Sequence, residues 1–388
     1  MFNIKLSDMK KLLLISTIIL LSITSNQGQT NITTTTPPES KKKVQVAILF
    51  DTSNSMDGLI DQAKSRIWSI VNEISNLKYN DEIPEIEIGL YHYGNDKLPM
   101  TKNYIEQILP LTSDLDLISE KLFGLKTNGG SEFCGAVIQE SLNELNWSND
   151  TNNLKMIYIA GNESFNQGPV NYKEVCANAS SKNIFINTIY CGSYENGIRE
   201  FWKDGAKCSN GDYFNIDSDR AIVHYKTPYD EQINLYNDSL NNTYYGYGSI
   251  GKRKKSLQLL QDSNAEMESI SVKTERAIVK SKGKVYKNKN WDLIDAVEEE
   301  EIDITKLTEN ELPDEFKGKS NSEKKSMLEK AKQDRKKYQK IIGDLAVERE
   351  KYIINEKKKD TENPKEDDFG SSVNESIMNK AKKIGFDK

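Results

Sequence analysis

The chain has 388 residues, with 59 acidic and 53 basic side chains, a formal net charge of -6 and a pI near 5.4. This length accommodates one sizeable α/β domain and a further region. The mildly acidic balance gives no reason to expect a nucleic acid partner, because such partners are bound by basic surfaces.

The N-terminal residues have the layout of a secretory signal peptide. Lys10 and Lys11 precede an apolar run over residues 12–23, and small and polar residues follow it. The run is too short to span a bilayer, and no later segment of spanning length occurs. We therefore predict a signal peptide over residues 1–29, no transmembrane anchor, and a secreted or periplasmic location. Residues 30–43, rich in Thr, Pro and Lys, are predicted to be a solvated linker.

A strand and a loop with three oxygen-bearing side chains come next. Residues 44–50 are mostly apolar and rich in β-branched side chains, which predicts a buried strand. Asp51, Ser53 and Ser55 follow directly, and their alternate spacing in an extended segment points all three side chains to one side. Carboxylate and hydroxyl oxygens suit Mg²⁺ or Mn²⁺ rather than zinc, so we predict a site for one of these ions. The alternative is a loop that only caps the next helix.

Apolar periodicity predicts alternating strands and helices from residue 44 to about residue 247. The expected strands cover residues 44–50, 86–93, 105–111, 156–159, 184–191 and 213–216, and the expected helices cover residues 60–77, 114–125, 137–145, 172–179, 198–202 and 229–244. This alternation is typical of an α/β fold with a doubly wound, mostly parallel sheet flanked by helices. Such sheets bind ligands at the carboxyl ends of their strands, where Asp51, Ser131 and Asn162 would meet.

Residues 51–55, Asp-Thr-Ser-Asn-Ser, match the DxSxS motif of von Willebrand factor A-type (VWA) domains. The chain resembles this family over residues 44–247, and its layout is similar to that of secreted bacterial VWA proteins. The resemblance implies a metal-ion-dependent adhesion site (MIDAS) at the end of the first strand, in which Asp51, Ser53 and Ser55 hold a divalent cation.

Two further segments carry the resemblance. A loop with two adjacent glycines ends in Ser131 and Glu132, which supply oxygen atoms there, and the resemblance places Ser131 at the position of a Thr in the family's second metal loop. At the end of the strand over residues 156–159, Gly161 stands where the family has an Asp. The neighbouring Asn162 or Glu163 could supply an oxygen instead, directly or through water.

The chain has four cysteines, namely Cys134, Cys176, Cys191 and Cys208, which permit two disulfides in an exported protein. A zinc site is disfavoured because there is no CxxC pair and only two His residues occur. Cys191 and Cys208 flank a short segment rich in Gly and charged residues, and we predict that they pair. Four buried or unpaired thiols are the alternative.

The C-terminal third is polar and rich in Lys and Glu. Residues 248–320 are predicted to be a charged, partly helical extension, and residues 356–388 a disordered tail. Between them, residues 321–355 are predicted to form one helix, whose apolar stripe has heptad spacing but contains Arg335 and Arg349. That helix could form a weak coiled coil with another copy, lie on the VWA domain, or stay solvated.

These features predict an exported, non-enzymatic, adhesion-type module that binds an Asp or Glu carboxylate of a partner protein through Mg²⁺ or Mn²⁺. One alternative is an envelope scaffold with a metal-free VWA fold that acts through its C-terminal helix; deletion from Gly248 onward would separate the two. A remote alternative is a haloacid-dehalogenase-like phosphotransferase with Asp51 as nucleophile. Ser53, two residues later, could not replace the acid and base of such an enzyme, and the sequence has no GxSxG or GxxxxGK[ST] motif.

Overall fold

The computed structural model describes residues 41–217, 225–359 and 369–388. The predicted signal peptide (residues 1–29) and most of the predicted linker (residues 30–43) lie outside these ranges. The described residues belong to one compact unit. None of their helices is both long and apolar enough to cross a bilayer.

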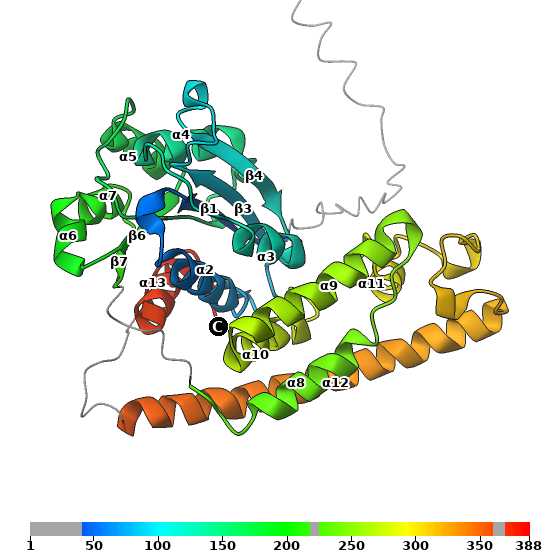
Figure 1. Ribbon diagram of the computed structural model, residues 1–388. Helices are drawn as coiled ribbons and strands as arrows, with labels where there is room; N and C mark the ends of the chain where they lie inside the picture. The colour runs from blue at the N-terminus through cyan, green and yellow to red at the C-terminus, as the bar shows by residue number, and fades with distance from the viewer. Residues whose placement is uncertain (1–40, 218–224, 360–368) are drawn as a thin grey trace, which may run out of the picture. The chain divides into compact units, whose positions relative to one another are not determined.

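A six-stranded sheet organises this unit (Figure 1). Its strands are β1 Lys43–Asp51, β3 Glu85–Tyr93, β4 Ile105–Thr112, β5 Leu154–Gly161, β6 Ile184–Cys191 and β7 Tyr213–Ile216. They lie in the order β4-β3-β1-β5-β6-β7, and only β4 is antiparallel to its neighbour. Because β1 pairs with β3 on one side and β5 on the other, the chain winds outward from it in both directions. The predicted doubly wound, mostly parallel sheet is confirmed.

Helices cover both faces of the sheet. Their bounds are α2 Ile60–Ile74, α3 Leu115–Phe123, α4 Cys134–Glu144, α5 Tyr172–Ser181, α6 Tyr194–Arg199, α7 Trp202–Lys207 and α13 Phe369–Lys383, with the short 3-10 helices η1 Asn54–Met56 and η2 Met100–Lys102. Ile48 and Phe50 of β1 pack in one hydrophobic cluster with α2, α3 and α13, whereas Ala47 and Leu49 pack in another with α4, α5 and α7. The alternation of side chains along a strand therefore supplies both clusters.

The last helix corrects the prediction of a disordered tail over residues 356–388. That prediction is wrong for residues 369–388, where α13 packs against α2 and β7 and the short strand β8 Phe386–Asp387 pairs with β2 Lys78–Tyr79. Phe369, Val373 and Ile377 recur every four positions and are buried, so the helix has a narrow apolar stripe. The many Lys, Asn and Ser residues around this stripe gave the segment its disordered composition.

The helices after β7 form an insertion between β7 and α13. They are α8 Asp230–Asn241, α9 Gly248–Glu268, α10 Ile270–Ser281, α11 Leu293–Glu298 and α12 Asn321–Lys359, with the 3-10 helices η3 Ile304–Lys306 and η4 Asp314–Phe316. α12 lies beside α8 and contacts α10 (Figure 1). The sheet domain thus consists of residues 43–217 together with residues 369–388, and residues 225–359 are the insertion helices.

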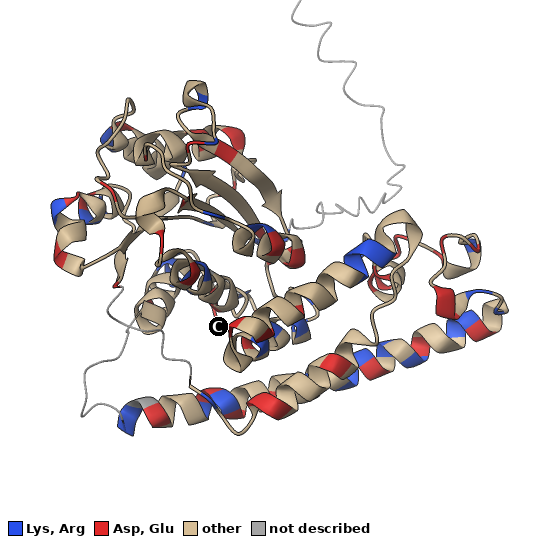
Figure 2. Cartoon of the chain, in the orientation of Figure 1, with Lys and Arg blue, Asp and Glu red and all other residues tan. Residues whose placement is uncertain are grey.

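Charged side chains of both signs are interspersed along α12 (Figure 2), but its two heptad-stripe arginines are buried. The Arg335 guanidinium donates to Asp292 and Asp295, with both N···O distances 2.7 Å. The Arg349 guanidinium donates to Asp230 at 2.8 Å. Arginine in the stripe is therefore compatible with burial because the facing helices of the same chain supply carboxylates. The stripe packs within the chain, beside α8 and α10.

Replacing Arg335 by Met should lower the free energy of unfolding by about 3 to 5 kcal/mol, because Asp292 would remain buried without its counter-charge. Urea denaturation of the two proteins would measure the difference. Lys330→Met is the matched control, since Lys330 is an exposed residue of the same helix. Equal stability of the Arg335 and Lys330 variants would contradict the packing of α12.

Ile377→Ala should lower the free energy of unfolding by about 3 kcal/mol, because it leaves a cavity under α13. Ile377 is 1% exposed. Asn379→Ala, at an exposed position of the same helix, should change stability by less than about 0.5 kcal/mol. If the C-terminal segment were disordered, thermal melting would not distinguish these two variants.

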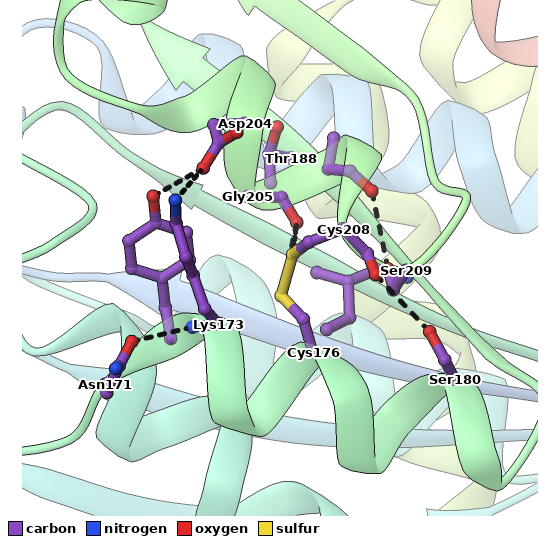
Figure 3. The surroundings of a disulfide bond; sticks show 12 residues. Asn171, Lys173, Cys176, Ser180, Thr188, Asp204, Gly205, Cys208 and Ser209 are labelled. Atoms are coloured by element: carbon purple, nitrogen blue, oxygen red, sulfur yellow. Dashed lines mark hydrogen bonds and ion pairs between the residues drawn. A yellow bond between two sulfur atoms is a disulfide. The ribbon is translucent and has the colours of Figure 1, made fainter.

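The predicted Cys191–Cys208 pairing is wrong. Cys176 of α5 is bonded to Cys208, which follows α7, with a Cα–Cα distance of 5.6 Å (Figure 3). Cys191 ends β6 and packs in the cluster with α2, whereas Cys208 packs on the opposite face of the sheet. Tyr172 donates a hydrogen bond to Asp204 at 2.6 Å, which also joins α5 to α7.

Non-reducing peptide mapping should recover one linked pair of peptides, containing Cys176 and Cys208, and two free thiols at Cys134 and Cys191. The double variant Cys176→Ser/Cys208→Ser should lose about 4 kcal/mol of stability, because the bond closes a loop with a sequence separation of 32 residues. Reduced wild type should melt like the double variant. A linked peptide containing Cys191 would contradict the structure.

Candidate metal site at the carboxyl edge of the sheet

The candidate site lies where the chain leaves β1, at the point from which the strands wind in opposite directions. Asp51 is the last residue of β1 and pairs with Tyr93 of β3. The neighbouring strand on the other side, β5, ends at Gly161 and is followed by Asn162. Parallel strands place these ends at one edge of the sheet, so the predicted loops do meet there.

The Asp51 carboxylate is fully buried and only partly satisfied. Its Oδ1 accepts a hydrogen bond from the Ser53 backbone N–H at 2.8 Å, whereas its Oδ2 has no hydrogen-bond partner among the described residues. Burial raises the pKa of Asp51 to about 7, and the nearby carboxylates of Glu132 and Glu163 add to the rise. An ionised carboxylate in this position calls for a positive charge close to Oδ2.

The two serines of the DxSxS motif connect Asp51 to the end of β5. Ser53 Oγ lies 2.7 Å from Ser55 Oγ. Ser55 Oγ donates to the side-chain oxygen of Asn162 at 2.8 Å, and the Asn162 amide donates back to the Ser55 carbonyl at 2.8 Å. Of the residues predicted around Gly161, Asn162 therefore does reach the first loop.

The loop before α4 brings Glu132, rather than Ser131, next to Asp51. A Cβ atom built on Gly94 would lie 2.8 Å from Asp51 Oδ1 and 2.9 Å from Glu132 Cγ. Ser131 is half-buried in the same segment and forms no hydrogen bond with Asp51, Ser53 or Ser55 in the described part of the chain. Burial raises the pKa of Glu132 to about 6, and repulsion from Glu163 contributes. The signal for Glu132 was an acidic residue directly after the Gly-Gly-Ser sequence.

Gly161 has no room for the aspartate that the resemblance places there. A Cβ atom at this position would lie 2.7 Å from the Tyr93 hydroxyl oxygen and 3.0 Å from the Trp202 ring. Tyr93 is held in place because its hydroxyl donates to the Ala160 carbonyl at 3.1 Å. The Trp202 indole N–H donates to the Glu163 carbonyl at 2.7 Å, which fixes the loop after β5.

The donor set fits a hard divalent cation. Asp51, Ser53 and Ser55 offer carboxylate and hydroxyl oxygens, and one carboxylate oxygen is buried without a hydrogen-bond partner among residues 41–217, 225–359 and 369–388. Soft metals are disfavoured because these donors are oxygen atoms. The described residues contain no group of three or more His, Cys, Asp or Glu side chains that could hold a metal ion, so hydroxyl oxygens and water would have to complete the shell. The residues present therefore suit Mg²⁺ or Mn²⁺, with water completing the shell.

Several solved structures are similar to part of this chain. BatB from Bacteroides thetaiotaomicron matches at 19% identity over 45% of this chain and 90% of that one, with a TM-score of 0.34. The SpRpn10 VWA domain matches at 18% identity over 45% and 88%, with a TM-score of 0.34. Proximal thread matrix protein 1 from the mussel byssus, with a zinc-occupied MIDAS motif, matches at 13% identity over 46% and 43%, with a TM-score of 0.35.

No protein-family model matches the sequence, and no curated protein sequence matches it. The assignment of the fold depends on the molecule's own features. These are the strand order β4-β3-β1-β5-β6-β7 and the DxSxS loop directly after the central strand. The sheet domain of this chain, about half of its length, therefore has the fold of a VWA domain.

Proposed function

We propose that this chain is an exported, non-enzymatic interaction protein, whose VWA domain binds a partner carboxylate through a divalent cation. The observation that carries the proposal is the buried Asp51 Oδ2, which has no hydrogen-bond partner in the described part of the chain and is followed directly by the loop of the Ser53 and Ser55 hydroxyls. Asp51, Ser53 and Ser55 would hold Mg²⁺ or Mn²⁺. Ser131, Asn162 and Glu163 are proposed to contribute oxygens through water.

Such a site binds its partner by electrostatic attraction between the metal ion and a carboxylate. When bound, the ion supplies a positive centre with a coordination position that an Asp or Glu of the partner can take. Asp51 offsets part of the positive charge from below the surface. The Ser53 and Ser55 hydroxyls orient their lone pairs without adding charge, so attraction for an incoming carboxylate remains. Asn162, which is hydrogen-bonded to Ser55, would keep that hydroxyl in place at the exposed mouth of the site.

Export is supported by the chemistry of the cysteines. The Cys176–Cys208 disulfide is typical of an oxidising compartment, such as the periplasm or the cell exterior. The apolar run over residues 12–23, with Lys10 and Lys11 before it, would direct the chain there.

The two alternatives are less well supported. A phosphotransferase would need a proton-transferring acid where Ser53 stands. A scaffold acting through its C-terminal helix would need that helix free, yet the heptad stripe of α12 is packed beside α8 and α10. Deletion from Gly248 onward would not separate adhesion from scaffolding, because it removes α13 from the core of the sheet domain.

Calorimetric titration of the full chain with Mn²⁺ and Mg²⁺, after treatment with a chelator, would test the proposal. Wild type should bind at least one of the ions saturably and melt at a higher temperature with it. Asp51→Asn should weaken binding at least tenfold, or about 1.4 kcal/mol, because it removes the one charged ligand of the loop. Asp61→Asn, at an exposed position on α2, should bind like wild type. An identical response of wild type and Asp51→Asn would rule out this site.

A further inference from the structure

Six Asp and Glu side chains are buried among the described residues, and they fall into two groups. Four of them form ion pairs with a buried Arg or Lys: Asp116 and Asp262 with Arg276, Asp230 with Arg349, and Asp292 with Arg335. Asp51 and Glu132 are the other two, and neither forms an ion pair with any described residue. A fold that pairs its other buried carboxylates leaves these two without a counter-charge.

The unpaired carboxylates are also neighbours. A Gly94 Cβ would approach both within 3 Å, at 2.8 Å from Asp51 Oδ1 and 2.9 Å from Glu132 Cγ. Gly94 has a φ of +73°, so its backbone itself favours glycine, and the two side chains occupy the space that this glycine leaves. Ser53 donates its backbone N–H to Asp51 Oδ1 at 2.8 Å, and its side chain lowers the pKa of both Asp51 and Glu132, so it is close to both carboxylates.

Glu132 is held at this place by backbone packing. A Cβ atom on Gly130 would collide with the Gly94 carbonyl, so these two segments of the chain are in direct backbone contact. The Asp96 N–H donates to the Gly129 carbonyl, which fixes the same approach. The segment that carries Glu132 is thus held against the end of β3, beside Asp51, by the protein's own backbone contacts.

The other charged side chains that raise the pKa values of this pair are also acidic. Glu163 acts on both Asp51 and Glu132, and Asp96 acts on Glu132. Two adjacent buried carboxylates surrounded by further negative charge are costly unless a cation neutralises them. Asp51 Oδ2, which is buried and has no hydrogen-bond partner among the described residues, belongs to this pair and is available to an electropositive ligand.

We propose that Glu132 is the second carboxylate ligand of the metal site, and that it takes over the charge that Gly161 cannot provide. The inference rests on the metal-site function proposed above. Asp51 and Glu132 would be the two charged ligands of one divalent cation, and a coordination position would stay open for the partner's carboxylate. The site would therefore depend on the loop before α4, and not on a side chain at the end of β5, where Tyr93 and Trp202 leave no room.

The test is calorimetric titration of the full chain with Mn²⁺, comparing wild type, Glu132→Gln, Glu132→Asp and Glu174→Gln. Glu132→Gln should weaken Mn²⁺ binding at least tenfold, and Glu132→Asp should retain more of the affinity than Glu132→Gln. Glu174 is exposed on α5, so Glu174→Gln should bind like wild type. Without metal, Glu132→Gln should melt at or above the wild-type temperature, since it removes one of two uncompensated buried charges; a residue with only a structural role would lower it.

The two proposals fail in different ways. If wild type does not bind Mn²⁺ or Mg²⁺, the metal-site function is wrong and the role of Glu132 falls with it. If wild type binds and Asp51→Asn does not, while Glu132→Gln binds with wild-type affinity, the site stands and the inference on Glu132 is overturned. Should Glu132→Gln fail to fold, Glu132→Asp decides. A ligand carboxylate shortened by one CH₂ group should bind Mn²⁺ more weakly than wild type, and wild-type affinity in this variant would overturn the inference.

Discussion

Burial of the central strand on both faces is the constraint on which the rest of this structure depends. β1 has neighbours on either side and an apolar cluster above and below, so each face of the sheet must be covered by helices. Part of one face is covered by α13, the last helix of the chain, which packs on α2 and β7. The insertion helices, residues 225–359, therefore lie in sequence between β7 and α13, and α13 completes the core of the sheet domain.

Buried charge has different consequences in the two parts of the molecule. In the insertion, carboxylates such as Asp262 and Asp292 meet Arg and Lys from facing helices, and such pairs fix which helices face each other. At the carboxyl edge of the sheet, Asp51 is buried to the same degree, but no Arg or Lys among the described residues pairs with it, and its Oδ1 accepts a hydrogen bond from the Ser53 backbone N–H. The ion-paired carboxylates hold the insertion helices together, whereas a carboxylate without a counter-charge at the carboxyl edge of the sheet is suited to bind a cation from solution.

The sequence predicted the sheet domain well because its signals are local. The apolar run before Asp51 and the three- and four-residue periodicities of the flanking helices identify the elements without any tertiary information. The cysteine pairing failed for a tertiary reason, since Cys191 and Cys208 are close in sequence but lie on opposite faces of the sheet. The C-terminal helix was missed because the apolar stripe of Phe369, Val373 and Ile377 is sparse. The stripe stabilises a helix only because it packs against the apolar side chains of α2, which sequence periodicity does not reveal.

The site shows the same division between local and tertiary information. The spacing of Asp51, Ser53 and Ser55 can be recognised in the sequence, and so can the absence of an acid at Gly161. The sequence does not show why the glycine is there, because the atoms that exclude a side chain come from Tyr93, on a strand earlier in the chain, and from Trp202 on α7. The carboxylate beside Asp51 likewise comes from a different segment, fastened by contact between two glycine backbones. Packing around Gly161 excludes a carboxylate at the end of β5, and the contact between Gly94 and Gly130 places the carboxylate of Glu132 beside Asp51 instead. The same negative charge can therefore come from a different loop when packing closes one position and opens another.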